Sequence, residues 1–418
     1  MDLLADLERR GLVHDTTDRA ALAARIAEGP LTLYHGVDPT APSLHHGNLI
    51  GLLMLRRFQD AGHRPIALAG GATGMIGDPG GRSEERNLLD LDTLATNVAA
   101  IKAQISRILG SEGAWTLVDN HTWTADLRLL DFLRDVGKHA TVNQMMARDS
   151  VKVRMAGEHG ISFTEFSYAL LQANDFRHLY ETHDVELQAG ASDQWGNIVA
   201  GVDLIRRRLG KQAHAITHPL MTKSDGTKFG KSVGGSVWLD PTRTSPYQFS
   251  QFWMQSDDEM VATYLKMLSL REFEEIQALL ADHEAAPERR VAQRALAMEL
   301  TTMVHGAEAW EAATEATRVL FGGDPTTASP AAFAALASEV PTTKVGIADL
   351  ADTIAIFARV GLATSNGDSR RTLQQKGFRA NGIQLDANAQ LTDVPLLHGR
   401  YLLLRKGKSN HHLVEISG

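Results

Sequence analysis

Residues 31–48, LTLYHGVDPTAPSLHHGN, decide the fold. They begin with a short apolar run that ends at Gly36 and is typical of a β-strand. An Asp-Pro pair soon breaks this run, and over residues 44–59 apolar side chains recur at helical spacing. Between strand and helix lies SLHHGN, residues 43–48. Such a junction favours phosphate binding, because the first N–H groups of a helix lack internal partners.

The same alternation of strand-like and helix-like stretches continues over the first 240 residues. Further strands are expected at 64–69, 115–120, 185–189 and 215–221, and further helices at 94–109 and 127–139. This order favours a parallel sheet with helices on both faces, in which ligands sit at the carboxyl ends of the strands. The sequence therefore predicts an α/β protein whose first part is Rossmann-like.

The rest of the chain has a different pattern. Residues 245–320 are mostly helical with charged faces, residues 321–343 are rich in Gly, Pro, Thr and Ala, and the last part is basic on a chain of net charge −8. A basic module on an acidic chain is a candidate RNA-binding unit. We predict four parts: a catalytic domain at 1–240, a helical domain at 241–325, a linker at 326–346, and a small α+β RNA-binding domain at 347–418.

Composition excludes several classes of protein. The chain has no cysteine, so it forms no disulfide and no thiolate metal site, as expected in a reducing compartment. No apolar run approaches the ~20 residues that cross a bilayer. The N-terminal stretch MDLLADLERRG has early acids and lacks the apolar core of a signal peptide. We therefore expect a cytoplasmic protein without membrane attachment.

Two segments of the first part could hold a nucleotide. Gly47 allows a ligand to approach the helix backbone, and His45 could donate hydrogen bonds to phosphate oxygens. The alternative is an ordinary capped helix start with exposed histidines. Residues 223–232, KSDGTKFGKS, place three lysines in a loop, where they could stabilise charge on departing pyrophosphate. The alternative is a solvated basic loop.

Two further patterns could bind a small substrate. Tyr168, Gln172 and Asp175 are spaced i, i+4 and i+7, so they share one face of a helix with mostly apolar neighbours. They line either a ligand pocket or an ordinary solvent face. Asp193, within GASDQWGN, could accept hydrogen bonds from ribose hydroxyls or cap the following helix.

Taken together, the first junction and the lysine loop resemble class I aminoacyl-tRNA synthetases. Residues 45–48, HHGN, resemble the HIGH signature of that class, and residues 228–232, KFGKS, resemble its KMSKS signature. Five blocks are similar to motifs of bacterial tyrosyl-tRNA synthetases, in the same order: YHGVDPTAPSLHHGN, GGATGMIGDPGGRSEER, ISFTEFSYALLQANDF, GASDQWGN and DGTKFGKS. This resemblance covers essentially the whole chain.

The resemblance implies an enzyme that activates L-tyrosine with ATP and transfers it to the 3′-terminal adenosine of tRNA. It implies that the phenol hydroxyl of tyrosine meets Tyr34 and Asp175. The residues implied at the rest of the amino acid are Asp78, Tyr168 and Gln172 for the ammonium group and Gln194 for the activated carboxyl region.

The resemblance also implies an ATP site. Its members are His45, Gly47, Asn48, Asp193, Lys228 and Lys231, with Asp193 on the ribose. His45, Lys228 and Lys231 are the candidate catalytic residues, which stabilise the departing phosphates. No tightly bound cofactor and no protein-bound metal are expected, since Mg²⁺ arrives with ATP as part of the substrate.

Residues 369–382 and 405–408 resemble a small RNA-binding fold that is also present in a ribosomal small-subunit protein. The candidate tRNA-binding residues there are Arg370, Arg371, Lys406 and Lys408. Arg206, Arg207 and Arg208 either contact the acceptor stem or form a solvated helix end. The resemblance implies a homodimer in which one tRNA spans both subunits.

Three rival interpretations remain. A tryptophanyl-tRNA synthetase shares the class I architecture, but it usually lacks the basic last part and matches YALLQAND less well. A small-molecule adenylate-forming ligase would not need an RNA-binding module. A catalytically silent RNA-binding relative conflicts with the intact candidate residues His45, Asp78, Asp175, Asp193, Lys228 and Lys231.

Overall fold

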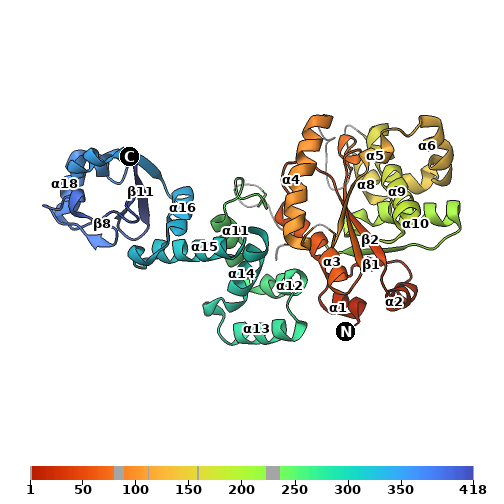
Figure 1. Ribbon diagram of the computed structural model, residues 1–418, viewed down its shortest axis with the longest axis horizontal. Coiled ribbons are helices and arrows are strands. Elements are labelled where there is room, and N and C mark those ends of the chain that lie inside the picture. Colours follow the sequence, from red (N-terminus) through yellow and green to blue (C-terminus); the bar gives the residue numbers. More distant parts are fainter. Residues whose placement is uncertain (1, 80–88, 112, 158–159, 223–235, 418) are drawn as a thin grey trace. The chain divides into compact units, whose positions relative to one another are not determined.

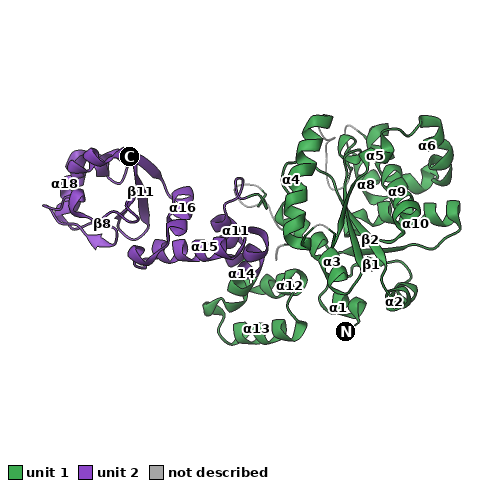
Figure 2. Cartoon of the chain, viewed as in Figure 1, with its two compact units in different colours: residues 1–240, 256–296 green, residues 241–255, 297–418 purple. Residues whose placement is uncertain are grey.

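The protein is described by a computed structural model (Figure 1), which covers residues 2–79, 89–111, 113–157, 160–222 and 236–417. The chain forms two compact units (Figure 2). Unit 1 comprises residues 1–240 and 256–296, and unit 2 comprises residues 241–255 and 297–418. The four-part division of the sequence stays a prediction.

A six-stranded sheet forms the centre of unit 1, in the order β1-β6-β5-β2-β3-β4. Its strands are β1 Asp15–Thr16, β2 Thr32–Val37, β3 Arg64–Ala69, β4 Thr116–Asp119, β5 Val185–Ala191 and β6 His214–His218. Neighbouring strands run parallel, except that β1 pairs antiparallel with β6. The predicted α/β architecture with a parallel sheet is confirmed.

Long helices cover both faces of this sheet (Figure 1). Helices α3 (Leu49–Asp60) and α4 (Leu91–Leu109) lie on one face, and α9 (Phe163–His183) and α10 (Trp195–Leu209) lie on the other. Because both faces are covered, the central strands are apolar along most of their length. Tyr34, in the middle of β2, faces α9 and packs against Phe176, with ring centroids 5.4 Å apart.

Shorter elements complete unit 1. They are α1 Leu3–Arg9, α2 Arg19–Ala27, η1 His46–Asn48, η2 Thr73–Met75, α5 His121–Thr124, α6 Leu129–Asp135, η3 Gly137–His139, α7 Val142–Met146, α8 Asp149–Met155, η4 Ser192–Gln194, α12 Asp258–Leu268, α13 Phe273–Ala285 and η5 Pro287–Arg289. Helix α14, Val291–His305, passes from unit 1 into unit 2. Among the residues that the structure describes, no helix is long and apolar enough to cross a bilayer.

The helix expected from residue 44 begins later than predicted. Residues 46–48 form the 3₁₀-helix η1, and regular α-helix begins only at Leu49. The delay has a local cause, because the ring of His45 accepts the N–H of Gly47 while the amide oxygen of Asn48 accepts the N–H of His45. These two reciprocal bonds satisfy N–H groups at the junction and set where the helix begins.

Unit 2 is built around a second sheet of five strands, in the order β7-β11-β10-β8-β9. The strands are β7 Thr342–Gly346, β8 Phe378–Ala380, β9 Ile383–Gln384, β10 Tyr401–Lys406 and β11 Asn410–Ser417. The other elements are α11 Pro246–Met254, α15 Ala307–Leu320, η6 Pro325–Thr327, α16 Pro330–Glu339, η7 Ile347–Ala351, α17 Thr353–Arg359, α18 Asn366–Gln374 and η8 Leu391–Asp393. The last part of the chain is therefore α+β, as the sequence predicts.

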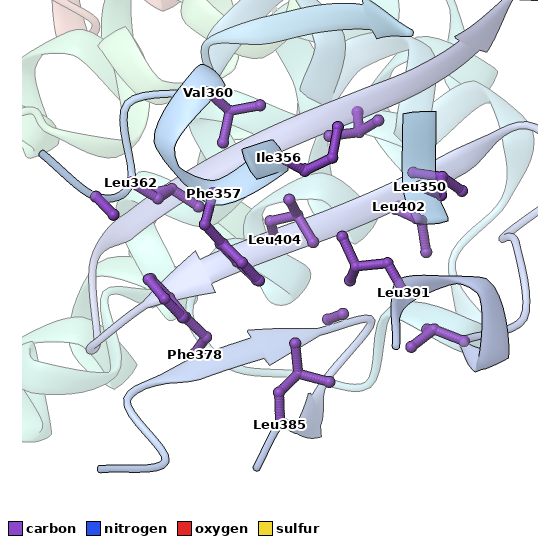
Figure 3. Close-up of a cluster of buried hydrophobic side chains, with 14 of the residues drawn as sticks. Leu350, Ile356, Phe357, Val360, Leu362, Phe378, Leu385, Leu391, Leu402 and Leu404 are labelled. Carbon is purple, nitrogen blue, oxygen red and sulfur yellow. The ribbon is translucent and has the colours of Figure 1, made fainter. Parts of the chain in front are cut away.

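This second sheet has an apolar cluster on each face. Leu402 and Leu404 of β10 belong to a core with Phe357 of α17 and Phe378 of β8 (Figure 3). Leu403, between them, points to the opposite face and joins a second cluster with residues of α15 and α16. The segment predicted as a linker thus contains the packed helix α16 and strand β7, because Ala332, Phe333 and Leu336 recur at helical spacing and are buried.

We expect Phe357→Ala to loosen unit 2 strongly. The Phe357 ring is fully buried and stacks on Phe378 with centroids 3.9 Å apart, so its removal leaves a cavity and costs about 3–5 kcal/mol. Hydrogen exchange of the β10 and β11 amides measures this, with the exposed Ile383→Ala as control. Unchanged exchange in Phe357→Ala would contradict the assigned core.

Candidate active site

A cavity of about 290 Å³ opens at the carboxyl ends of the parallel strands of unit 1. Strands β2 and β5 supply part of its wall, and helix α9 supplies another part. Its polar or charged lining residues are Tyr34, His35, Asp38, Thr40, His45, Asn48, Thr73, Asp78, Tyr168, Gln172, Asp175, Gln188 and Gln194. The cavity lies where a parallel α/β sheet places its ligand site.

The polar stripe on α9 faces this cavity. Tyr168, Gln172 and Asp175 all line it, so the stripe is not a solvent face. The side-chain oxygen of Gln172 is buried and has no hydrogen-bond partner among the described residues. A buried acceptor of this kind needs a donor, which a ligand in the cavity can supply.

Tyr34 and Asp175 are deeply buried polar residues of the cavity wall, with 1% and 2% of their surfaces exposed. The hydroxyl of Tyr34 has no hydrogen-bond partner among the described residues. Burial raises the pKa of this phenol well above its usual value, and the charge of Asp175 adds to the shift. The Tyr34 hydroxyl is therefore neutral, and it can both donate a hydrogen bond to a ligand and accept one.

The carboxyl group of Asp175 is held by two donors. The amide of Asn120 donates to one oxygen at 2.9 Å, and the indole N–H of Trp123 donates to the other at 2.8 Å. Burial raises the pKa of Asp175 to about 7, although both hydrogen bonds lower it, and the nearby Asp38 raises it further. Near neutral pH this carboxyl group can therefore gain or lose its proton.

A chain of hydrogen bonds links Asp175 to the other side of the cavity. Asn120 also donates to the hydroxyl of Thr73 at 3.1 Å, and Thr73 donates to Asp38 at 2.8 Å. The hydroxyl of Tyr168 donates to the second oxygen of Asp38 at 3.0 Å. These bonds fix the orientation of the side chains that a ligand would meet.

The two residues after β3, Gly70 and Gly71, lie too close to carboxylate groups to carry side chains. A Cβ atom at Gly70 would lie 2.2 Å from a carboxylate oxygen of Asp38, and one at Gly71 would lie 2.2 Å from a carboxylate oxygen of Asp119. Neither side chain could then keep its position. The paired glycines after β3 thus allow the network to close.

A second polar group lies at the end of β5. Gln194 donates from its amide to Asp78 at 2.7 Å and accepts from Asn197 at 3.2 Å. Arg148 donates to the Asn197 oxygen at 3.4 Å. Burial lowers the pKa of Arg148, and the charge of Asp78 opposes that shift. Asp78, Gln194 and Arg148 are thus connected through hydrogen bonds and charge. Asp78 and Gln194 line the cavity wall.

His45 combines a capping role with a place in the cavity wall. Its Nδ1 accepts the N–H of Gly47 at 3.0 Å, so in the neutral ring the proton is on Nε2. Burial lowers the pKa of His45 to about 4, and His46 contributes to the shift, so the ring is neutral at pH 7. Gly47 lies against this ring, because a Cβ there would be 2.8 Å from its Cε1. The predicted alternative of exposed histidines does not hold, since His46 is buried.

The remaining ATP-site candidates are placed differently. Asn48 lines the cavity, whereas Asp193 is exposed and lines a neighbouring hollow of about 580 Å³ together with Arg148. Asp193 does not cap α10, whose N-cap is Gln194. Lys228 and Lys231 lie outside the described residues.

The candidate tRNA-binding arginines on α10 have partners within the protein. Arg206 bonds to Asp203 at 2.9 Å, Arg207 donates to the carbonyl of His139 at 2.9 Å, and Arg208 donates to the carbonyl of Asp135 at 3.0 Å. They are therefore neither a purely solvated helix end nor three free cations.

The candidates in unit 2 are more accessible. Arg370, Arg371 and Lys408 are exposed. Lys406 is partly buried and bonds to Asp368 at 3.3 Å.

Sequence reasoning missed the residues that orient the pocket. Asp38, Thr73, Asn120 and Trp123 form the network, but none of them was selected as a site residue. A usable signal was present, because Asp38 and Thr73 come shortly after predicted strands and Asn120 is the last residue of the strand predicted at 115–120.

Comparison with known proteins agrees with this geometry. The family model described as tRNA synthetases class I (W and Y) matches residues 27–322, and that of the tyrosine–tRNA ligase SYY-like C-terminal domain matches residues 332–414. A tyrosine–tRNA ligase of Opitutus terrae is 51% identical over the full length of both chains. The chain belongs to the tyrosine–tRNA ligase family.

Solved structures extend this result. A C-terminally truncated mitochondrial tyrosyl-tRNA synthetase of Aspergillus nidulans is 33% identical, with a TM-score of 0.69 over 77% of this chain and 94% of that one. A tryptophanyl-tRNA synthetase of Plasmodium falciparum is 15% identical, with a TM-score of 0.55 over 72% of this chain and 83% of that one, so this likeness shows the fold alone. The resemblance to tyrosine–tRNA ligases inferred from sequence is confirmed.

We expect the indole of Trp123 to report the titration of Asp175. Its fluorescence should change with a midpoint near pH 7, because its N–H bonds directly to the titrating carboxyl group. In Asn120→Ala the midpoint should move to higher pH, since the lost hydrogen bond lowers this pKa. The measurement is the difference between titrations of the wild type and of Trp123→Phe.

Asp175→Asn serves as the control and should abolish the midpoint. A midpoint near pH 4 in the wild type, typical of an exposed carboxyl group, would contradict the buried geometry.

Proposed function

We propose that this cavity binds L-tyrosine and ATP and forms tyrosyl-adenylate, from which tyrosine passes to the 3′-terminal adenosine of tRNA. The observation that carries the proposal is the buried pair Tyr34 and Asp175. An unpaired hydroxyl and a carboxyl group face one cavity on a chain of the tyrosine–tRNA ligase family. Such a pair fits a phenol hydroxyl, which both donates and accepts.

Selection against phenylalanine follows from the same pair. A substrate without the hydroxyl would leave the buried Tyr34 hydroxyl without a partner and would give Asp175 no further hydrogen bond. A buried polar group left without its partner costs more than a hydrogen bond contributes, so the penalty falls on the wrong substrate. Asn120 and Trp123 keep Asp175 from turning away to another partner.

The α-ammonium group of tyrosine would lie among Asp78, Tyr168 and Gln172. Asp78 supplies negative charge, and the unpaired oxygen of Gln172 is an additional acceptor. Gln194, held against Asp78 at 2.7 Å, would orient the carboxyl group of the substrate with its amide. The phenol partners at one end and the acceptors for the ammonium group at the other would fix the direction of the amino acid.

The first chemical step is in-line attack by a tyrosine carboxylate oxygen on the α-phosphorus of ATP. The new bond is the mixed anhydride, the bond to the bridging oxygen breaks, and pyrophosphate leaves with Mg²⁺, which enters as part of the ATP substrate. The protein needs no nucleophile, so it acts by positioning and by charge stabilisation. Neutral His45 would donate from Nε2 to a phosphate oxygen, while the roles of Lys228 and Lys231 stay predictions from the sequence.

In the second step a ribose hydroxyl of tRNA attacks the carbonyl carbon of the adenylate, and AMP leaves. Arg370, Arg371, Lys406 and Lys408 in unit 2 would hold the tRNA through its phosphates. Asp193 and Gly47 are proposed at the nucleotide, and Arg206, Arg207 and Arg208 are proposed for the acceptor stem.

The proposal predicts exchange of pyrophosphate into ATP with tyrosine alone among the twenty amino acids, measured without tRNA. Tyr34→Phe should lose at least about tenfold in preference for tyrosine over phenylalanine, because one hydrogen bond to the phenol is lost. Tyr180→Phe, also on the α9 side of the sheet but outside the cavity, is the matched control.

Exchange with tryptophan instead of tyrosine would contradict the proposal and indicate the activity of a tryptophanyl-tRNA synthetase. Absence of exchange with every amino acid, from folded protein, would favour an RNA-binding relative without catalysis.

We also propose that the protein is a homodimer. Large apolar side chains are exposed along α6, α7, α8 and the start of α9: Leu129, Leu130, Leu133, Val142, Met146, Val153, Met155 and Phe163. Eight exposed apolar residues within one stretch of about 35 residues exceed the scattered apolar residues of a monomer surface, and they favour a self-association surface.

Phe163→Asp should therefore shift the protein from dimer to monomer in analytical ultracentrifugation. Phe163 is 77% exposed, so the charge disturbs no core but would be desolvated at an interface. Leu91→Asp, at an exposed leucine on α4 away from this stretch, is the matched control. A dimer that persists unchanged in Phe163→Asp would place the interface elsewhere.

A further inference from the structure

The indole of Trp123 stacks against the imidazole ring of His178, which belongs to no part of the pocket network described above. The two ring centroids lie 4.4 Å apart and the planes are inclined by 19°, so the rings are nearly parallel. Stacked aromatic pairs stabilise a structure beyond what the burial of their area contributes. The same indole donates its N–H to Asp175 at 2.8 Å, so one side chain connects the stack to the buried carboxyl group.

His178 and Asp175 lie about one turn apart on the same helix. They are three residues apart on α9, and side chains at this spacing are neighbours on one face. The indole of Trp123 therefore spans one turn of α9, with its N–H bonded to Asp175 and its ring supported by His178. A tilt of the indole plane that breaks the N–H bond would also open the stack.

The local structure around Trp123 gives this support its importance. Helix α5, which carries Trp123, has only four residues, and its N-cap residue makes no side-chain capping bond. A helix this short is stabilised by tertiary packing more than by its own backbone bonds. Trp123 is half-buried and also packs against the apolar cluster that contains Phe176 and Leu179. The orientation of the indole therefore depends on the side chains around it.

The imidazole ring supports the indole without adding charge beside Asp175. Burial lowers the pKa of His178, the neighbouring Arg177 and His183 lower it further, and Glu181 opposes them, so the ring is neutral at pH 7. A positive charge one turn from Asp175 would favour the ionised carboxylate. With a neutral ring in that place, burial and the two hydrogen bonds remain the main influences on the protonation of Asp175.

A simpler account treats His178 as an ordinary surface residue that covers part of an apolar side chain. An aliphatic side chain of similar size would then serve equally well, and the contact would have no effect on the pocket. The nearly parallel planes, and the direct bond from the same indole to Asp175, favour a role in orientation instead. A flat ring limits the tilt of a stacked partner in a way that a flexible aliphatic chain does not.

We propose that His178 is a positioning residue for the selection of tyrosine. Its ring holds the Trp123 indole in the orientation that donates to Asp175, and Asp175 then presents an oriented carboxyl group to the phenol hydroxyl of the substrate. His178 does not line the cavity, so it acts through Trp123. The inference rests on the proposed function, because it takes tyrosine as the substrate.

The first test follows substrate selection in the full-length protein. Exchange of pyrophosphate into ATP is measured with tyrosine and with phenylalanine, and the ratio of the two kcat/KM values is compared between variants. His178→Ala should lower this ratio about threefold to tenfold, as expected for the loss of an aromatic pair, while the KM for ATP stays unchanged. His178→Phe keeps a ring and should stay within about twofold of wild type, whereas His178→Leu should be impaired like His178→Ala.

The second test needs no activity, because Trp123 fluorescence reports the pH midpoint of Asp175. The midpoint is taken from the difference between each variant and the same variant with Asp175→Asn, which also cancels the titration of the His178 ring. In His178→Ala it should move to higher pH, since a weakened N–H bond no longer lowers the pKa of Asp175. His178→Phe should keep the wild-type midpoint.

His183→Ala is the matched control, because this histidine is exposed at the end of the same helix and its ring is hydrogen-bonded to Thr182. It should change neither the selectivity ratio nor the midpoint. A ratio or a midpoint in His178→Ala equal to that of wild type, or full recovery in His178→Leu, would overturn the inference. Absence of tyrosine-dependent exchange in the wild-type protein would instead overturn the proposed function, and the midpoint would still test whether His178 orients Trp123.

Discussion

Asp175 carries a carboxyl group that is almost completely removed from water and is held, within the described part of the chain, by two donors, the amide of Asn120 and the indole of Trp123. Burying an acid without full compensation is unfavourable, and burial accordingly raises the pKa of Asp175 to about 7. The rest of the cavity is arranged around this group. Asn120 is itself fixed by Thr73 and by the N–H of Ala72, and Thr73 is fixed by Asp38, so that a change at any of them alters the environment of Asp175.

The parallel sheet brings the residues of this network together. Asp38, Thr73 and Asn120 follow β2, β3 and β4, and the parallel order brings the ends of these strands together without long loops. The glycines at 70 and 71 remove the side chains that would otherwise occupy the space of Asp38 and Asp119. The polar network thus depends on the backbone geometry, and the shape of the pocket depends on the network.

Periodicity was sufficient to predict the parallel sheet of unit 1, and the i, i+4, i+7 spacing predicted that Tyr168, Gln172 and Asp175 share a face. It could not show which face meets a cavity, because that depends on packing between α9 and strands distant in sequence. The pairing of Asn120 with Asp175 was equally inaccessible, since the contact spans 55 positions. Helix α16 falls within the predicted linker because residues 321–343 are rich in Gly, Pro, Thr and Ala, whereas its burial depends on Phe333 meeting Tyr401 of a distant strand.

The net charge of −8 raises the question of how this chain attracts a polyanion. The overall field opposes tRNA, so affinity has to arise from local groups that gain more near RNA than in water. Exposed lysines with acidic neighbours, such as Lys344 beside Glu415, contribute little because they are already compensated. Cations exposed on unit 2, such as Arg370 and Lys408, are therefore the groups proposed to meet the tRNA phosphates.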